Sequence, residues 1–387
     1  MVKAIKVMLI PNNVQKTKMF QYAGASRFAY NWALAREKEN YEKGGKFISD
    51  SELRKEFTKL RHSDEYAWLL NISNNVTKQA IKDACTAYKN FFKGLQKFPR
   101  FKSKKRSMPK FYQDNVKIRF SSTHIKFEGF SSSRKANKQK MNWVRLAEHG
   151  RIPTDVKYMN PRISFDGLNW WISVCVEFPD CRETLHDDGV GIDLGIKDFA
   201  VCSDGVKYKN INKSQKVRKL EKQKRRLQRS ISRSYEKNKK GESYCKTNNV
   251  IKKERLLLKL NYRLTNIRKN YLNQTISEIV NRKPRFICIE DLNVSGMMKN
   301  RHLSKAVQEQ GFFWFRKQLE YKCSDKGIQL IVADRFYPSS KLCSCCGNIK
   351  KDLKLSDRVY RCECGNMIDR DFQASINLKA YGERFAG

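Results

Sequence analysis

The sequence predicts a multidomain α/β protein, and three observations carry this prediction. The chain has 387 residues, which at about 100–200 residues per domain leaves room for two to four domains. Its first hundred residues carry apolar side chains at helical spacing, whereas its second half alternates apolar strands with helices. Because 40% of the residues are hydrophobic, we expect a globular chain with a real core rather than a disordered one.

The first part of the chain is expected to be a strand followed by a helical bundle. Residues 4–11 predict a strand that ends at Pro11. Helical spacing then continues to about Tyr41-Glu42, and two or three further helices are expected within 49–60 and 73–95.

A β-domain is expected from Lys97 to Phe178, where short strand-like segments follow one another. The clearest hairpin joins 162–165 to 169–176 through Asp166-Gly167, a pair that favours tight primed turns. If the opening strand joins this sheet, the helical bundle is an insertion in a β-barrel.

The second half begins after a linker at Pro179–Thr184 with an apolar strand at Val190–Leu194. Between Lys213 and Lys269 there are 21 Lys or Arg residues against 4 acids, which favours two long basic helices around a break at 239–241. A hairpin over 199–208 is expected before these helices. After them we expect a strand over 285–290, a helix over 304–326 stopped by Gly327, a strand over 328–333 and a short helix over 371–380.

The charge of the chain indicates a polyanionic partner. The formal net charge is +41, from 80 Lys and Arg against 39 Asp and Glu. An RNA or DNA backbone fits such a charge best, although charge alone does not exclude a basic ribosome-associated protein. The densest cationic stretches are 97–110 and 216–233, where aromatic side chains could stack on bases or belong to the core.

Location is expected to be the cytoplasm, with no membrane partner. No run of about 18 apolar residues occurs, and the opening residues are too charged for a signal peptide.

Three acids stand out in this basic chain: Asp193 in Gly-Ile-Asp-Leu-Gly, Glu290 in Ile-Cys-Ile-Glu-Asp-Leu, and Asp371 in Asp-Arg-Asp-Phe-Gln. An acid that ends an apolar strand is costly unless it is paired or bound to a cation. Carboxylates from different strands can hold two Mg²⁺ about 3.5–4 Å apart for phosphodiester hydrolysis. The alternative is that each acid caps an element or pairs with one of the many cations, and strand periodicity does not choose between Glu290 and Asp291.

The cysteines predict a second metal site. Five of the 12 cysteines lie between Cys343 and Cys364, which in a reducing compartment points to metal. Cys343-x-x-Cys346 and Cys362-x-Cys364 resemble a four-thiolate Zn²⁺ site, and the glycine after each second ligand favours Cys346 over Cys345. The alternative is a degenerate module without zinc, since the second pair is one residue shorter than usual.

Together these motifs resemble the TnpB family of insertion-sequence proteins, RNA-guided nucleases related to type V CRISPR effectors. The resemblance spans essentially the whole chain and rests on the following segments: Gly191–Gly195, Ile289–Val294, Leu319–Lys322, Pro338–Lys341 with Cys343-Ser344, and Asp369–Asp371.

The resemblance implies an RNase H-like (RuvC) nuclease whose triad is Asp193, Glu290 and Asp371, with Asp369 as the alternative third acid. Asp193 and Asp371 would bridge Mg²⁺, Glu290 would hold the second ion, and water would be the nucleophile. Gln373 stands where the family usually has Asn, and it keeps the amide.

The resemblance also implies a location in the prokaryotic cytoplasm or nucleoid, together with domains and partners. The expected segments are a β-barrel wedge domain at 1–12 and 97–182, a helical recognition insert at 13–96, a RuvC-like domain at 187–340 with basic helices at 213–280, a zinc-ribbon insert at 341–367 that binds target nucleic acid, and a C-terminal RuvC segment at 368–387. The expected partners are a guide RNA from the transposon end and target double-stranded DNA with a short flanking motif. The alternatives are a nuclease-silent RNA-guided regulator and an accessory transposase protein.

Overall fold

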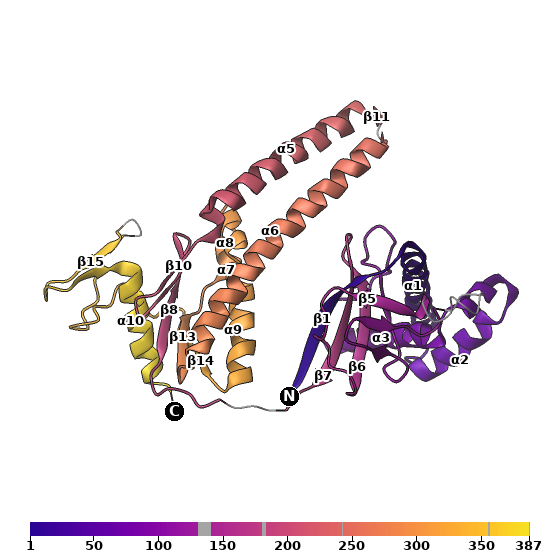
Figure 1. Ribbon diagram of the computed structural model, residues 1–387, viewed down its shortest axis with the longest axis horizontal. Helices are drawn as coiled ribbons and strands as arrows, with labels where there is room; N and C mark the ends of the chain where they lie inside the picture. The colour runs from indigo at the N-terminus through magenta and orange to yellow at the C-terminus, as the bar shows by residue number, and fades with distance from the viewer. Residues whose placement is uncertain (131–140, 180–182, 242, 355–356, 387) are drawn as a thin grey trace. The chain divides into compact units, whose positions relative to one another are not determined.

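The computed structural model describes residues 1–130, 141–179, 183–241, 243–354 and 357–386. The chain forms two compact units, Met1–Asp180 and Cys181–Gly387 (Figure 1). The boundary falls within the linker expected at Pro179–Thr184, of which residues 180–182 lie outside the described residues.

The first unit is built on a seven-stranded antiparallel sheet with the order β2-β6-β7-β1-β5-β4-β3. Its strands are β1 (Val2–Ile10), β2 (Lys110–Tyr112), β3 (Arg119–Phe120), β4 (His124–Lys126), β5 (Trp143–Leu146), β6 (Tyr158–Phe165) and β7 (Trp170–Glu177). The opening strand β1 pairs with β7 from Val2↔Glu177 to Leu9↔Trp170. The helices between β1 and β2 are therefore an insertion in this sheet, and the hairpin expected around Asp166-Gly167 is present as β6 and β7.

The sheet differs from the closed barrel expected from the sequence. Its two end strands, β2 and β3, are not paired with each other in the described part of the chain. They have only 3 and 2 residues.

The inserted helices are α1 (Asn13–Glu42), α2 (Asp50–Arg61), the 3₁₀ helix η1 (Asp64–Asn71) and α3 (Asn74–Phe92). Helix α1 begins at a capping box in which Asn12 accepts from the Gln15 N–H and the Gln15 side chain accepts from the Asn12 N–H. Tyr22 of α1 packs edge-on against Phe111 and Phe130, so helices and sheet share one hydrophobic core.

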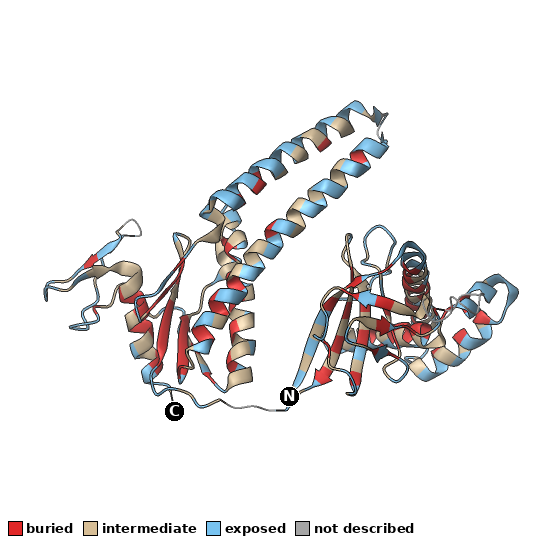
Figure 2. Cartoon of the chain, in the orientation of Figure 1, coloured by how far each residue is buried: buried red, intermediate tan, exposed pale blue. Residues whose placement is uncertain are grey.

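The second unit contains a five-stranded mixed sheet with the order β10-β9-β8-β13-β14. The strands are β8 (Val190–Leu194), β9 (Asp198–Cys202), β10 (Lys207–Lys209), β13 (Phe286–Glu290) and β14 (Gln329–Ala333). Strands β8, β13 and β14 are parallel, and β9 and β10 are antiparallel additions. Every residue of β8 and β13 is buried except Asp193 and Glu290, which are half-buried (Figure 2).

Two layers of helices cover this sheet. One face packs against α6 (Asn248–Asn281), α8 (Ser304–Gln310) and α9 (Phe312–Lys326), and it includes Ile192 and Ile289. The other face includes Phe286 and Cys288 and packs against Leu378 of α10 (Arg370–Glu383).

Helices α5 (Gln215–Lys237) and α6 form the long basic hairpin expected from the sequence. Val217, Leu220 and Leu264 form the buried contact between them, and the short strands β11 (Lys239–Lys240) and β12 (Ser243–Tyr244) close its tip. The hairpin extends from the sheet, and most of its outer surface is exposed (Figures 1 and 2). No helix among the described residues is both long and apolar enough to span a bilayer.

One helix expected from the sequence is two helices. Gly311 adopts a left-handed conformation with φ of 71° and separates α8 from α9, so the helix expected over 304–326 is interrupted. Gly327 caps α9 with φ of 77°, as expected. A short helix, α7 (Val294–Met297), precedes this pair.

Candidate active site and metal centre

Asp193 and Glu290 lie level with each other at the ends of adjacent parallel strands. The register pairs Gly191 with Cys288 and Ile192 with Ile289, so the next residue along each strand is one of the two acids. Because side chains alternate along a strand, both acids project to the face that carries Gly191 and Cys288. That is the face covered by α10.

Helix α10 brings Asp371 to the same end of the sheet. A Cβ on Gly191 would lie 2.0 Å from the Ser375 carbonyl oxygen and 2.4 Å from the Lys379 nitrogen, so α10 crosses β8 at backbone contact. The later residue Gly382 lies against Phe286, at the start of β13. The helix therefore runs opposite to the strands, and Asp371, one turn before Ser375, lies near Asp193.

Burial and the neighbouring acids raise the pKa of Asp193 and of Glu290. Burial raises the pKa of Asp193 well above its usual range, and repulsion from Glu290 and Asp371 adds to the rise. Burial and Asp371 also raise the pKa of Glu290 to about 7, although a hydrogen bond from the Leu194 N–H opposes the rise. Such a group of acids favours a bound cation, because a cation removes the repulsion between ionised carboxylates.

Asp291, the neighbour that sequence periodicity could not exclude, faces a different environment. Its carboxylate accepts hydrogen bonds from Arg316 Nη1 at 2.7 Å and Arg335 Nε at 3.0 Å. These two arginines lower the pKa of Asp291. Its charge is already compensated by two hydrogen-bonded arginines, whereas Arg370 favours the ionised form of Glu290 only in part and burial outweighs it.

Asp369, the alternative third acid, caps α10. Its side chain accepts from the Phe372 N–H at 3.1 Å and lies 3.5 Å from Lys207 Nζ. Asp369 therefore has a structural task, whereas Asp371 in the first helical turn raises the pKa of both Asp193 and Glu290 and has Arg370 Nε 4.0 Å from its carboxylate oxygen.

The second candidate site is a cluster of four cysteines, Cys343, Cys346, Cys362 and Cys364, whose sulfurs all lie within 4.8 Å of one another. Within the described ranges it is the only group of three or more potential metal ligands drawn together so closely. The fifth cysteine of this region, Cys345, is exposed and lies outside the cluster, as expected.

The geometry of the cluster fits a tetrahedral metal ion. Sγ–Sγ distances are 3.7 Å for Cys343–Cys364 and 3.5 Å for Cys346–Cys362, far longer than a disulfide. Four sulfurs at about 2.3 Å from one Zn²⁺ would be about 3.8 Å apart. Gly347 and Gly365 adopt φ of 76° and 90°, which lets each loop turn after its second cysteine.

Hydrogen bonds already favour a thiolate in this cluster. Burial favours the neutral form of Cys343, but the N–H groups of Cys346 and Cys345 and the Asn366 amide outweigh it and lower the pKa of Cys343 to about 6. At Cys364 the Asn366 N–H favours the thiolate, yet the neighbouring thiols raise the pKa to about 12. A divalent cation would stabilise all four as thiolates.

Three side-chain amides join the cysteine cluster to α10, of which Gln373 and Asn377 are buried and Asn366 is half-buried. The Gln373 Nε2 donates to the Leu342 carbonyl at 2.7 Å, and its Oε1 accepts from Ser344 and Asn366. Asn366 also donates to Cys343 Sγ at 3.4 Å, so its amide lies between the cluster and the helix. Asn377 adds bonds of 2.7 Å to the Leu342 and Ser339 carbonyls.

Sequence reasoning identified Gln373 only as a change of residue type and did not identify the roles of Asn366 and Asn377. The available signal was weak: amides on the apolar side of a short helix are unusual because buried amides need several partners. Gln373 and Asn377 are 0% and 2% exposed, and their partners come from the segment around the cysteine cluster: Ser339, Leu342, Ser344 and Asn366.

Three family models match the chain. Residues 1–46 match one described as "Helix-turn-helix domain", although this stretch folds as β1 and one long helix. Residues 173–301 match "Probable transposase", and residues 312–378, which contain the cysteine cluster, match "Cas12f1-like, TNB domain".

Curated relatives align with nearly the whole chain. The chain is 30% identical to "Putative RNA-guided DNA endonuclease InsQ" of Escherichia coli K12, over 98% of this chain and 92% of that protein. It is 29% identical to "Putative RNA-guided DNA endonuclease" of Streptomyces pristinaespiralis, over 98% and 89%.

Solved structures agree in fold. The chain matches "Cryo-EM structure of the Cas12f1-sgRNA-target DNA complex" with a TM-score of 0.59 and 12% identity, over 98% of each chain. It matches "Structure of the mini-RNA-guided endonuclease CRISPR-Cas_phi3" with a TM-score of 0.50 and 11% identity, over 98% and 92%. With a relative at 30% identity along almost its whole length, and with the transposase model matched in addition, the chain belongs to the TnpB family.

Proposed function

We propose that this protein is an RNA-guided DNA endonuclease of a transposon, which hydrolyses target DNA with a RuvC-like centre. The observation that carries the proposal is the placement of Asp193 and Glu290 at level strand ends, under the first turn of the helix that bears Asp371. The names of the full-length relatives support the same activity.

The proposed role of the acids follows from their charge and position. Two Mg²⁺ ions, when bound, would activate water and stabilise the leaving oxygen of the phosphodiester. Asp193 and Asp371 would ligate and bridge the ions, and Glu290 would hold the second. Glu290 is fixed for this role by the Leu194 N–H, and α10 holds Asp371 over the sheet.

The cysteine module is proposed to hold one structural Zn²⁺. The sulfurs would come from Cys343, Cys346, Cys362 and Cys364. The module, residues 341–367, has no large hydrophobic core of its own: among its described residues, Tyr360 is the one large aromatic side chain that is fully buried. The amides of Gln373 and Asn366 would then keep the module seated on α10.

The proposed partners are a guide RNA from the transposon end and double-stranded target DNA with a flanking motif. Guide pairing would supply sequence choice, while the protein contacts phosphates and duplex shape. The exposed cations of the α5–α6 hairpin and of residues 97–110 supply positive charge for those phosphates. In this scheme the first unit would act as wedge and recognition domains.

The test is plasmid cleavage by protein purified with co-expressed RNA from its own locus. We expect cleavage with Mg²⁺, and none with EDTA or in Asp193→Ala. Cleavage that survives EDTA or the substitution would refute the metal centre. RNA-dependent target binding by wild-type protein that never cuts would favour a nuclease-silent regulator instead.

The description of the family as "Probable transposase" supports a second candidate, an accessory transposase protein. That candidate predicts strand joining or transposon excision by the purified protein, whereas the nuclease predicts linear or nicked products only. Analysis of the product ends separates the two.

A further inference from the structure

Gly24 lies in the middle of α1, where the fold gives no reason for a glycine. A glycine inside a helix is destabilising compared with alanine. Its φ is not positive, and a Cβ added at this position would meet no heavy atom within 4 Å. The residue therefore leaves the helix backbone bare at an open surface, which suggests that something outside the fold approaches it closely.

Two cavities lie on either side of this bare backbone. They have volumes of about 860 and 690 Å³, and both are lined by Gln21, Gly24 and Arg27. Residues three apart share one helical face, so the two cavities form a continuous surface across α1.

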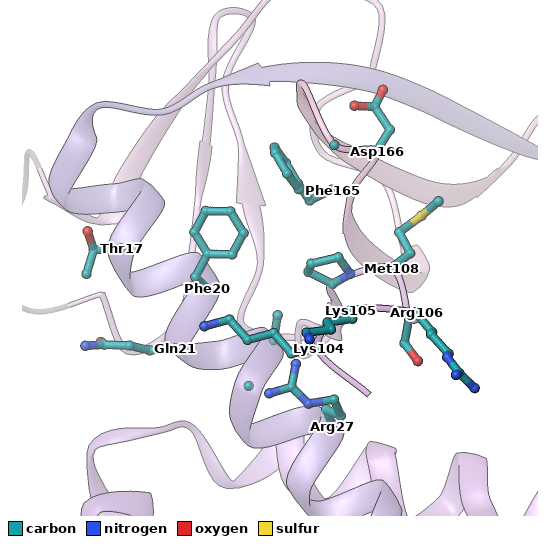
Figure 3. Close-up of a pocket in the computed structure, with 15 residues that line it drawn as sticks. Thr17, Phe20, Gln21, Arg27, Lys104, Lys105, Arg106, Met108, Phe165 and Asp166 are labelled. Atoms are coloured by element: carbon teal, nitrogen blue, oxygen red, sulfur yellow. The ribbon is translucent and has the colours of Figure 1, made fainter. Parts of the chain in front are cut away.

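The larger cavity combines an aromatic wall with unpaired cations (Figure 3). Phe20 is 45% exposed although it packs edge-on against Phe165 and Trp170, with ring centroids 5.2 and 4.9 Å away. Its packing fixes the ring and leaves part of it open for stacking.

The cations of this cavity are Arg27, Lys104, Lys105 and Arg106. None of them forms an ion pair with any acid in the ranges that the structure describes. The single acid of the wall, Asp166, is engaged, because it accepts from Trp171 Nε1 at 2.7 Å and from two backbone N–H groups. The cavity is therefore positive and lacks internal compensation.

The basic loop is held in place by its own serines. The Ser103 N–H donates to Ser107 Oγ at 3.1 Å, and the Arg106 N–H donates to Ser103 Oγ at 3.1 Å. On the other side of α1, the smaller cavity presents Trp68, which is 46% exposed and lies 5.7 Å from the Phe28 ring. Each cavity thus has one exposed, supported aromatic ring.

We propose that this surface of α1 binds an unpaired segment of a nucleic-acid strand. The strand crosses the helix at Gly24, its phosphates lie against Arg27 and the Lys104–Arg106 loop, and its bases stack on Phe20 and Trp68. Aromatic platforms beside a cationic track are the general means of binding single strands. The identification of the partner as nucleic acid rests on the proposed function, but the site does not depend on the nuclease centre.

The first experiment measures binding of 5′-fluorescein-labelled U20 and dT20 to the full-length protein in EDTA at physiological salt. A Cβ at position 24 meets no heavy atom within 4 Å, and leucine is a better helix former than glycine, so we expect an unchanged or higher Tm for Gly24→Leu. Affinity should fall at least about tenfold, because the side chain occupies the path of the strand. The matched control is Lys16→Leu, an exposed position on α1 outside both cavities, which should keep affinity within about twofold.

The second experiment maps contacts on the wild-type protein, so it does not depend on how a variant folds. Photocrosslinking to the same oligonucleotides carrying 5-iodouracil should label the tryptic peptide 19–27, which contains Phe20 and Gly24. The U20 and dT20 arms show whether the strand is RNA or DNA.

Unchanged affinity in Gly24→Leu, or crosslinks confined to other peptides, would overturn the proposal even if the protein cuts DNA. Labelling of peptide 19–27 in a protein that never cuts would sustain this site and remove the proposed endonuclease. Binding of a peptide ligand to this surface, with no binding of either oligonucleotide, would also overturn the proposal.

Discussion

At the scale of single residues, strand register decides which acid of the Glu290-Asp291 pair belongs to the candidate centre. Alternation along the sequence left both open, because each lies on an opposite face of the same strand. The structure adds what the sequence lacks: Cys288 faces α10, and two distant arginines compensate Asp291. Such contacts between residues far apart in the chain cannot be read from local periodicity.

Neighbouring isosteric substitutions test this distinction. Glu290→Gln should lower Mg²⁺-dependent cleavage by at least about a hundredfold, the scale typical for loss of a metal-held charge at a reacting centre. Asp291→Asn should weaken only partly exposed ion pairs, costing about 0.2–1 kcal/mol of stability, and should leave cleavage within a few-fold. Initial cleavage rates of both variants provide the measurement, and equal losses would contradict the assignment.

The raised pKa of Glu290 predicts a pH-dependent stability in the absence of divalent metal. An acid whose pKa rises from 4.5 in the unfolded chain to about 7 in the folded protein loses stability as pH rises between those values. The whole effect is at most about 3 kcal/mol, at 1.36 kcal/mol per pKa unit.

Glu290→Gln removes that titration. In EDTA, its Tm should exceed that of the wild type by several degrees at pH 8, and the two should converge near pH 4.5. Thermal unfolding followed by circular dichroism at both pH values tests this expectation. A difference of the same size at both would show that burial does not perturb this carboxyl.

At the scale of elements, most helices and strands follow from periodicity, including the end of α1 at Glu42 and the β6–β7 hairpin. The failure at 304–326 has a local cause, because a glycine within a helical pattern gives no sign of its φ. The sequence also did not show whether the sheet closes into a barrel, because closure depends on pairing between end strands of only two or three residues.

The junction between α10 and the cysteine module predicts the effect of losing the Gln373 amide. Gln373→Ala leaves Ser344 and Asn366 without their acceptor and leaves the Leu342 carbonyl with Asn377 as its remaining donor, so unfolding free energy should fall by about 1–3 kcal/mol. Cleavage should fall because Asp371 lies two residues away on the same helix.

Gln373→Glu is the matched control for acceptor function, because it keeps the oxygen that accepts from Asn366 and loses the donor to Leu342. Because it also buries a carboxyl opposite the Leu342 carbonyl, it should be less stable to denaturant at neutral pH than Gln373→Ala and should recover stability as the pH falls. Bound zinc, measured by metal analysis, should stay at one per chain in both variants. Identical behaviour of all three proteins would contradict the role of this junction.

At the scale of the whole molecule, the two units have separate cores, and this predicts separable responses to metal removal. Strong chelation of zinc should loosen only the cysteine module, because its sulfurs are not part of either large core. Limited trypsin digestion should then cut first between Lys350 and Arg361. Early cleavage throughout the first unit would contradict this expectation.

Features that extend over the whole chain, such as charge and motif order, were the easiest to interpret from the sequence. The excess of cations, the order of the acids and the cysteine spacing together indicate the family to which the chain belongs. What required the structure was the convergence of elements more than 170 residues apart, at the point where β8 meets α10.

That convergence is tested most directly by locating divalent metal. Anomalous diffraction from crystals of the full chain grown with Mn²⁺ should show manganese coordinated by carboxylate oxygens of Asp193, Glu290 and Asp371. The manganese signal should be lost in Asp193→Asn. Manganese that binds elsewhere while these three carboxylates stay without metal would contradict the account.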